Sequence, residues 1–95
     1  VIGGTCVNVG CVPKKVWFNF ANYLEEAHRM KDYGVEGTEH LKLNFSVFKQ
    51  RRDAYIKRLN GIYEKNVGNS GIDYFTGTAS FVGPNEVETS EGKKI

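Results

Sequence analysis

The two cysteines of the chain lie five positions apart, in a run of glycine and apolar residues that ends in two lysines. The run reads GGTCVNVGCVPKK and contains Cys6 and Cys11. In a regular α-helix, Cα atoms five residues apart are separated by roughly 8–9 Å, whereas a disulfide needs about 4.4–6.8 Å. If Cys6 and Cys11 pair, the backbone between them must therefore depart from a straight helix. Gly10 and Pro13 are residues that permit such a departure.

Two close thiols beside lysines suit dithiol–disulfide exchange, which requires a thiolate, a partner thiol and access for the substrate. A helix N-terminus and the charges of Lys14 and Lys15 are expected to stabilise the thiolate. The spacing alone leaves open a pair of buried reduced cysteines at an irregular helix start. A zinc site is the weaker alternative, because structural zinc usually has four ligands and His28 and His40 form no partner pair.

Apolar residues recur at helical spacing in two long segments of the chain. The first helix is predicted from about Cys11 to Lys31, growing out of a loop that carries the cysteines, with Gly34 as its stop signal. After a surface connection, Asn44 or Ser46 is expected to cap a second helix that runs to about Asn69.

A region rich in aromatic and β-branched residues follows, and we expect strands within residues 72–95. Ile72–Val82 predicts one strand, followed by turn residues. A hairpin is expected from Val87–Thr89 and Lys93–Ile95, joined by a turn at residues 90–92.

The charge balance excludes some classes of partner. The net charge is +2, with acidic and basic residues interspersed, which favours neither nucleic acid nor a membrane surface. The sequence shows no signal peptide and no membrane span. Two close cysteines without secretory features indicate a reducing compartment. The chain has 95 residues, begins without methionine and ends in an apparent strand, so we expect an internal segment of a longer protein.

The whole run from Gly3 to Lys15 resembles the redox motif of the class I pyridine nucleotide–disulfide oxidoreductases. In that family NADPH reduces FAD, and FAD reduces an active-site disulfide. The resemblance implies an α/β fold: part of a Rossmann-like FAD-binding domain, with a redox helix, a second long helix and then strands. The NADPH site and an acid–base His–Glu pair are implied to lie outside the segment, which alone would be inactive.

The resemblance also assigns roles to individual residues. Cys6 resembles the thiol that attacks the substrate disulfide, and Cys11 the thiol that lies against the flavin. Thr5 and Cys6 resemble flavin-contacting positions, Lys14 the lysine beside the flavin N5, and Ala79 a residue near the adenine of FAD.

The ending CVPKK is similar to the branch of the family that reduces glutathione, trypanothione and thioredoxin disulfides. Residues 49–66 resemble a helix that binds glutathione disulfide, which implies that Tyr63, Tyr55, Ile62 and Asn66 line the substrate pocket. Without the resemblance, both tyrosines read as packing residues. The family also implies a homodimer in the cytoplasm, with mitochondria as a second compartment. The alternatives are a large-type thioredoxin reductase or, from another class, a non-catalytic thiol module that binds a soft metal.

Overall fold

The computed structural model describes all 95 residues, which form two compact units. The first unit is Val1–Glu64 and the second is Lys65–Ile95. The elements in chain order are α1 (Gly4–Val9), α2 (Cys11–Arg29), the 3₁₀ helices η1 (Met30–Tyr33) and η2 (Thr38–His40), α3 (Phe45–Asn69), β1 (Ala79–Gly83) and β2 (Glu86–Thr89).

The start of the chain differs from the prediction, because the cysteine run is helical rather than a loop. Cys6 lies within α1, whose inward-facing Val7 is buried, and Cys11 is the first residue of α2. The long first helix is confirmed. It continues through the single 3₁₀ turn η1 to Gly34, which adopts a left-handed φ of 86° and donates its N–H to the last carbonyls.

The second long helix is also confirmed, and the structure decides between its two candidate caps. The Asn44 side-chain oxygen accepts a hydrogen bond from the Val47 N–H at 3.1 Å, whereas Ser46 lies inside α3. The helix then runs to Asn69, and the expected surface connection before it contains the short η2.

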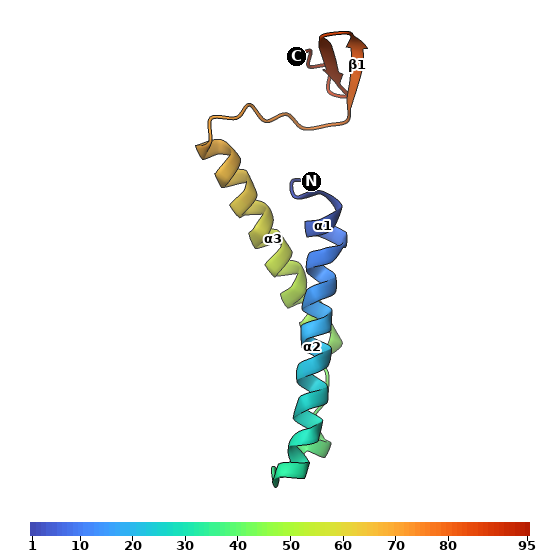
Figure 1. Cartoon of the computed structure of the whole chain (residues 1–95), viewed down its shortest axis with the longest axis vertical. Helices are drawn as coiled ribbons and strands as arrows, with labels where there is room; N and C mark the ends of the chain where they lie inside the picture. Colours follow the sequence, from blue (N-terminus) through green and yellow to red (C-terminus); the bar gives the residue numbers. More distant parts are fainter. The chain divides into compact units, whose positions relative to one another are not determined.

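In the first unit, α3 returns beside α1 and α2, which follow one another along the chain (Figure 1). Aromatic rings join α2 to α3: the Trp17 and Phe48 centroids are 4.5 Å apart, and those of Phe20 and Phe48 are 4.6 Å apart. The only buried apolar side chains of the chain are Val7 and Ile56. The core is therefore small and is concentrated where α3 meets the start of the chain.

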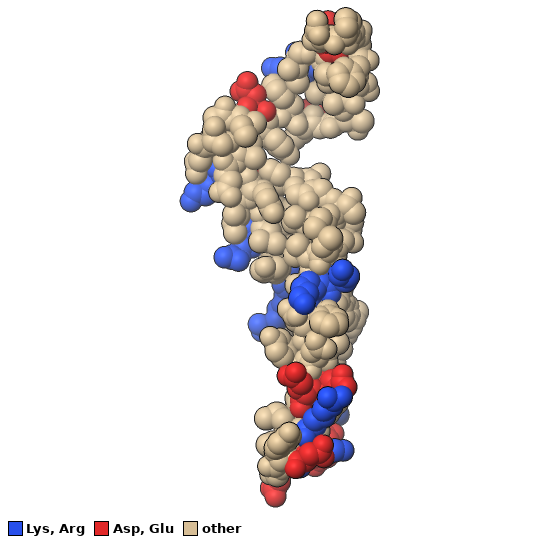
Figure 2. Space-filling model, in the orientation of Figure 1, with Lys and Arg blue, Asp and Glu red and all other residues tan.

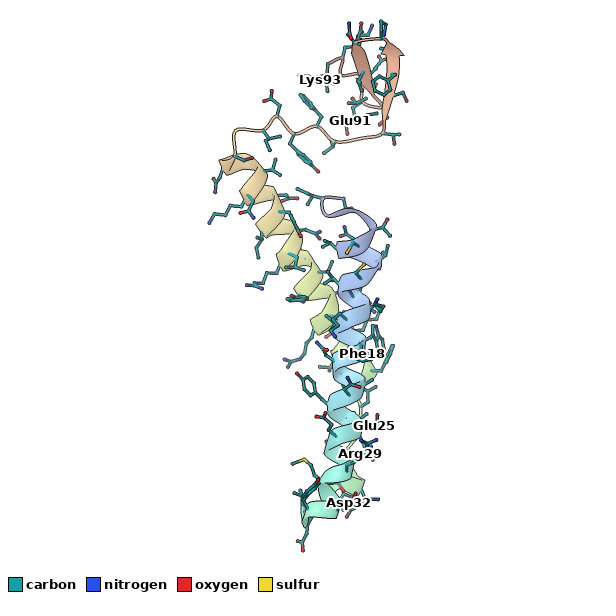
Figure 3. All side chains as sticks on the ribbon, viewed as in Figure 1. Phe18, Glu25, Arg29, Asp32, Glu91 and Lys93 are labelled. Carbon is teal, nitrogen blue, oxygen red and sulfur yellow. The ribbon has the colours of Figure 1, made fainter.

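Lys and Arg side chains lie along much of the first unit in Figure 2, and acidic side chains join them toward the far end of α2. Acidic and basic residues alternate there, and Figure 2 shows them as mixed red and blue. Glu25 and Arg29, labelled in Figure 3, form an ion pair across one helical turn. None of the helices combines the length and the apolar character that a membrane crossing requires.

The second unit contains an antiparallel hairpin whose strands are shorter than predicted. β1 begins at Ala79 rather than Ile72. It pairs antiparallel with β2, with Ala79 opposite Thr89 at one end and Gly83 opposite Glu86 at the other. The hairpin expected between Val87–Thr89 and Lys93–Ile95 forms as a short antiparallel contact around the Glu88–Lys94 bridge. The Val87 and Ile95 backbones exchange two hydrogen bonds of 2.9 Å, and the Thr89 N–H donates to the Lys93 carbonyl at 2.8 Å. The helices and the hairpin are compatible with an α/β segment.

Side-chain contacts outside the strands add to these backbone hydrogen bonds. The Thr76 hydroxyl donates to Glu91 at 3.0 Å, and Lys93 Nζ lies 5.2 Å from the centroid of the Phe75 ring. Glu91 and Lys93 are labelled in Figure 3.

Candidate functional site

α1, which contains Cys6, and α2, which begins at Cys11, meet at Gly10. The backbone of Gly10 has φ −123° and ψ −116°, so the helix breaks there, as the cysteine spacing predicted. A β-carbon on Gly10 would lie 2.9 Å from the Thr5 carbonyl oxygen and 3.2 Å from the Cys6 Cα. The junction is therefore close-packed backbone against backbone, which requires glycine. Pro13 follows in the first turn of α2, where a missing N–H costs least.

Both cysteines are free, exposed thiols, which excludes the alternative of a buried reduced pair in this segment. A hydrogen bond with the Cys11 side chain raises the pKa of the Cys6 thiol above its ordinary value. The positive charge of Lys14 acts in the opposite direction but is the smaller effect. The expected stabilisation of the thiolate by Lys14 is therefore present, but it is too small to decide the direction of the pKa shift at Cys6.

This hydrogen bond predicts how the reactivity of Cys6 depends on pH. A raised pKa means that the thiolate fraction at neutral pH is below that of an ordinary thiol, so alkylation by iodoacetamide should rise with pH through a midpoint above the ordinary one. Cys11→Ala should lower that midpoint and speed alkylation several-fold at neutral pH. Lys14→Gln should raise the midpoint further. The measurement is the rate of Cys6 labelling in the reduced full-length protein, followed by peptide mass spectrometry. A midpoint unmoved by Cys11→Ala would contradict the stated cause.

The two lysines of the motif have different surroundings. Lys14 lines a cleft of about 600 Å³ whose wall includes Val9, Pro13 and Trp17. Lys15, expected to face solvent, is exposed and places its Nζ 4.8 Å from the centroid of the Phe18 ring. Phe18 projects outward from α2 in Figure 3. Lys15 also lines a second cleft, together with Cys11, so each lysine borders a cleft beside the α1–α2 junction.

A second cleft brings one thiol together with a residue of the predicted substrate pocket. It has a volume of about 540 Å³, and both Cys11 and Tyr55 line it. Tyr55 projects from α3, whereas Cys11 begins α2. Two segments far apart in the sequence thus meet at the redox motif.

The other predicted site residues are all exposed. Ile62 and Tyr63 lie on α3 within the first unit, with 39% and 42% of their surface exposed. Thr5 lies on the exposed part of α1. Asn66, near the end of α3, and Ala79, the first residue of β1, belong to the second unit and are also exposed. Exposure leaves each of these side chains open to a ligand or to further protein.

Two asparagines that sequence reasoning did not single out connect α3 to the redox motif. Asn60 donates a hydrogen bond to the Asn8 side-chain oxygen at 3.0 Å, across 52 positions of sequence. Asn8 belongs to the cysteine run, and Asn60 follows Leu59 on the inward face of α3. A polar residue at a half-buried helical position was the only available signal, and it does not reveal its partner.

The described side chains include no group of three or more His, Cys, Asp or Glu residues that could hold a metal ion. Two exposed thiols, one on either side of a helix break and with lysines shortly after the second, form a candidate dithiol site. This is the class of site that thiol–disulfide oxidoreductases use.

Comparison with known proteins shows which enzymes this chain resembles. No protein-family model matches the chain. The chain is 50% identical over 88 residues to a glutathione reductase of Debaryomyces hansenii, with 88% of the chain covered. It is 48% identical over 86 residues to the glutathione reductase of Schizosaccharomyces pombe, with 90% covered. For that of Yarrowia lipolytica the identity is 46% over 82 residues, with 83% covered.

These matches show that the chain is a segment related to the glutathione reductases. It spans 18% of the length of the first two of these relatives and 17% of the third.

Proposed function

We propose that the protein containing this segment reduces glutathione disulfide to glutathione with electrons from NADPH, using bound FAD and the Cys6–Cys11 pair. The observation that carries the proposal is the exposed dithiol at the α1–α2 junction, in a chain up to 50% identical to proteins named glutathione reductase. The segment then belongs to a Rossmann-like FAD-binding domain, and the NADPH site lies elsewhere in the protein.

The residues around the junction suit the flat, electron-carrying ring of a flavin cofactor. Bound FAD would supply the electron pair that reduces the Cys6–Cys11 disulfide. Thr5, Cys6 and Lys14 would hold its flavin end, and Ala79 would meet its adenine. The fit is supported by the cleft beside Lys14, where apolar side chains such as Val9, Pro13 and Trp17 lie among polar and charged ones and the ammonium supplies positive charge. Such a charge favours the anionic form of a reduced ring.

The thiols carry out the exchange in two displacements. The Cys6 sulfur, once deprotonated, attacks one sulfur of glutathione disulfide, forms a mixed disulfide and releases the first glutathione. The Cys11 thiolate then attacks the Cys6 sulfur, which re-forms the Cys6–Cys11 disulfide and releases the second glutathione. Two electrons pass from the dithiol to the substrate, and the two thiol protons go to the two glutathione products. Because the hydrogen bond with Cys11 raises the pKa of Cys6, a base must remove its proton.

The proposed substrate pocket lies along α3. Tyr55 supports this assignment most directly, because it lines the same cleft as Cys11. Tyr63, Ile62 and Asn66 complete the pocket in the proposal, and each presents an exposed side chain. A tyrosine offers an apolar ring and a hydroxyl, which suits a peptide disulfide with both apolar and polar parts.

The proposal also covers the oligomeric state and the compartment of the full-length protein. The family resemblance supports a homodimer in the cytoplasm, with a mitochondrial share, and the glutathione pool of the cytosol keeps thiols reduced there. Sedimentation and cell fractionation test these two points. Neither a large-type thioredoxin reductase nor a soft-metal thiol module is favoured by the comparisons, which name glutathione reductases.

The test is NADPH oxidation by the full-length protein with glutathione disulfide, compared with oxidised thioredoxin at equal concentration. Glutathione disulfide should be turned over with the higher kcat/KM. Tyr63→Ala should lower kcat/KM for glutathione disulfide about tenfold, because the substrate loses a ring that packs against it and holds it in place. Tyr33→Ala is the matched control, because Tyr33 is 90% exposed at the far end of the unit. Preference for thioredoxin would overturn the substrate assignment, and an unchanged Tyr63→Ala would remove Tyr63 from the pocket.

A further inference from the structure

We propose that Asn60 is a positioning residue that sets the separation of the Cys6 and Cys11 thiols and thereby the balance between dithiol and disulfide. The inference rests on the proposed function for the redox role of the two cysteines. It concerns a side chain on α3 that contacts neither sulfur.

The Asn60 side chain holds the beginning of the chain with two hydrogen bonds. Its Nδ2 donates to the Ile2 carbonyl oxygen at 2.9 Å and to the Asn8 side-chain oxygen at 3.0 Å. Asn8 Nδ2 in turn donates to the Ile2 carbonyl at 3.1 Å and to the Gly4 carbonyl at 2.8 Å. The two amides and two backbone carbonyls form one half-buried network that spans α1 from its start to its last turn.

α1 needs this support because it is too short to be stable alone. It has six residues, and no side chain caps its first turn. Isolated helices of this length are not stable in water. Val7 contributes burial on the side facing α3, but Cys6 itself is exposed. The Asn60–Asn8 contact is therefore the directional restraint that fixes how α1, and Cys6 with it, is oriented.

α2, which carries Cys11, is held by a different part of the same helix. Trp17 of α2 packs on Phe48 of α3 at 4.5 Å between centroids, three turns before Asn60. α3 thus braces both sides of the Gly10 break, through ring packing on one side and the amide network on the other. Releasing the network frees α1 to move about Gly10 while α2 stays in place.

The direction of the expected effect follows from effective concentration. Two thiols held close together lose little freedom when they join, so positioning favours the disulfide. Loosening α1 lowers the effective concentration of one thiol at the other and shifts the equilibrium toward the dithiol. In the assay reaction, the Cys6–Cys11 disulfide and reduced dithiothreitol yield two cysteine thiols and cyclic oxidised dithiothreitol, so electrons and protons balance.

The experiment uses the full-length, FAD-loaded protein equilibrated in dithiothreitol redox buffers. Thiols are trapped with a maleimide mass tag, and the tagged Cys6–Cys11 peptide is quantified by mass spectrometry. Asn60→Ala should shift the equilibrium constant about tenfold toward the dithiol, which corresponds to ~30 mV for a two-electron couple. The alkylation midpoint of Cys6 should fall as well, because the hydrogen bond with Cys11 is weakened. Gln50→Ala is the matched control, since Gln50 is an exposed amide on the same helix.

Asn8→Ala removes the Asn60–Asn8 contact and the bonds from Asn8 to the Ile2 and Gly4 carbonyls, and it leaves the Asn60–Ile2 bond in place. It should give a shift similar to that of Asn60→Ala, and the double variant should add little to either one, because both lose one shared network. An equilibrium constant of Asn60→Ala equal to that of the unaltered protein overturns the inference. If Asn60→Ala does not fold, Asn8→Ala decides, and an unchanged equilibrium in that variant overturns it equally.

Different measurements test the positioning role of Asn60 and the proposed function. If the unaltered protein reduces no glutathione disulfide but Asn60→Ala still shifts the thiol equilibrium, the substrate assignment is wrong and the positioning role stands. If glutathione disulfide is reduced normally and the thiol equilibrium does not respond to either asparagine, the positioning role is wrong and the function stands.

Discussion

Replacing Cys11 with serine in the full-length protein is expected to abolish turnover and to trap one glutathione on Cys6. The attacking thiol remains, so the first displacement still forms the mixed disulfide, but no second thiol is present to resolve it. Steady-state reduction of glutathione disulfide should fall by roughly a thousandfold or more, as is usual when a covalent step loses its reacting group. Mass spectrometry of the protein, incubated with glutathione disulfide in its reduced state, should show the mass of one added glutathionyl group on the Cys6 peptide.

Cys6→Ser is the matched variant, and it separates the roles of the two sulfurs. It should lose turnover to the same extent, but without accumulating the adduct, because the thiol assigned to attack the substrate is absent. Both thiols are exposed, so accessibility alone does not predict this asymmetry. An adduct that accumulates on Cys11 in Cys6→Ser, with none on Cys6 in Cys11→Ser, would reverse the assignment.

A methyl group added at Gly10 is expected to be the most disruptive small change in the motif. The β-carbon of Gly10→Ala would lie 2.9 Å from the Thr5 carbonyl oxygen, a backbone atom that cannot turn aside as a flexible side chain can. Relief requires α1 and α2 to separate, at a cost of about 1–3 kcal/mol in the free energy of unfolding, as for other overpacked sites. Because the junction lies between the cysteines, the same movement should also slow formation of the Cys6–Cys11 disulfide.

Gly61→Ala provides the control for this substitution. Gly61 lies within α3, and a β-carbon there meets nothing within 4 Å. Alanine has the higher helix propensity, so this variant should be more stable by up to about 1 kcal/mol. Thermal unfolding of the full-length protein, together with the rate of disulfide formation after reduction, measures both effects. A Gly10→Ala protein that matches the unaltered one in both measurements would show that the junction is not closely packed.

Local signals in the sequence were sufficient for the long helices. The period of apolar residues placed α2 and α3, and Gly34 and Asn44 marked ends that the structure confirms through a left-handed glycine and a side-chain cap. These features depend on residues a few positions apart, which is the range over which helical contacts operate.

The strand predictions were less accurate, because strand formation depends on a partner. Residues 72–78 have strand-like composition, but the structure places no neighbouring strand beside them, and β1 begins only at Ala79. The β-propensity of a segment reports how well it suits a pleated surface, and it does not supply that surface. The prediction for the cysteine run was wrong for the opposite reason. Its glycines suggested a loop, whereas contacts with α3 support a helix there.

The sequence alone was enough to predict dithiol exchange, because the whole run from Gly3 to Lys15 resembles a known redox motif; the cysteine spacing by itself left other readings open. The three-dimensional arrangement was needed to show that a hydrogen bond between the sulfurs outweighs Lys14 at Cys6, and that Asn60 holds the helix carrying it. The physical reason is distance along the chain. Spacing within one motif can be read directly, whereas an interaction across 52 positions exists only after the backbone has brought its partners together.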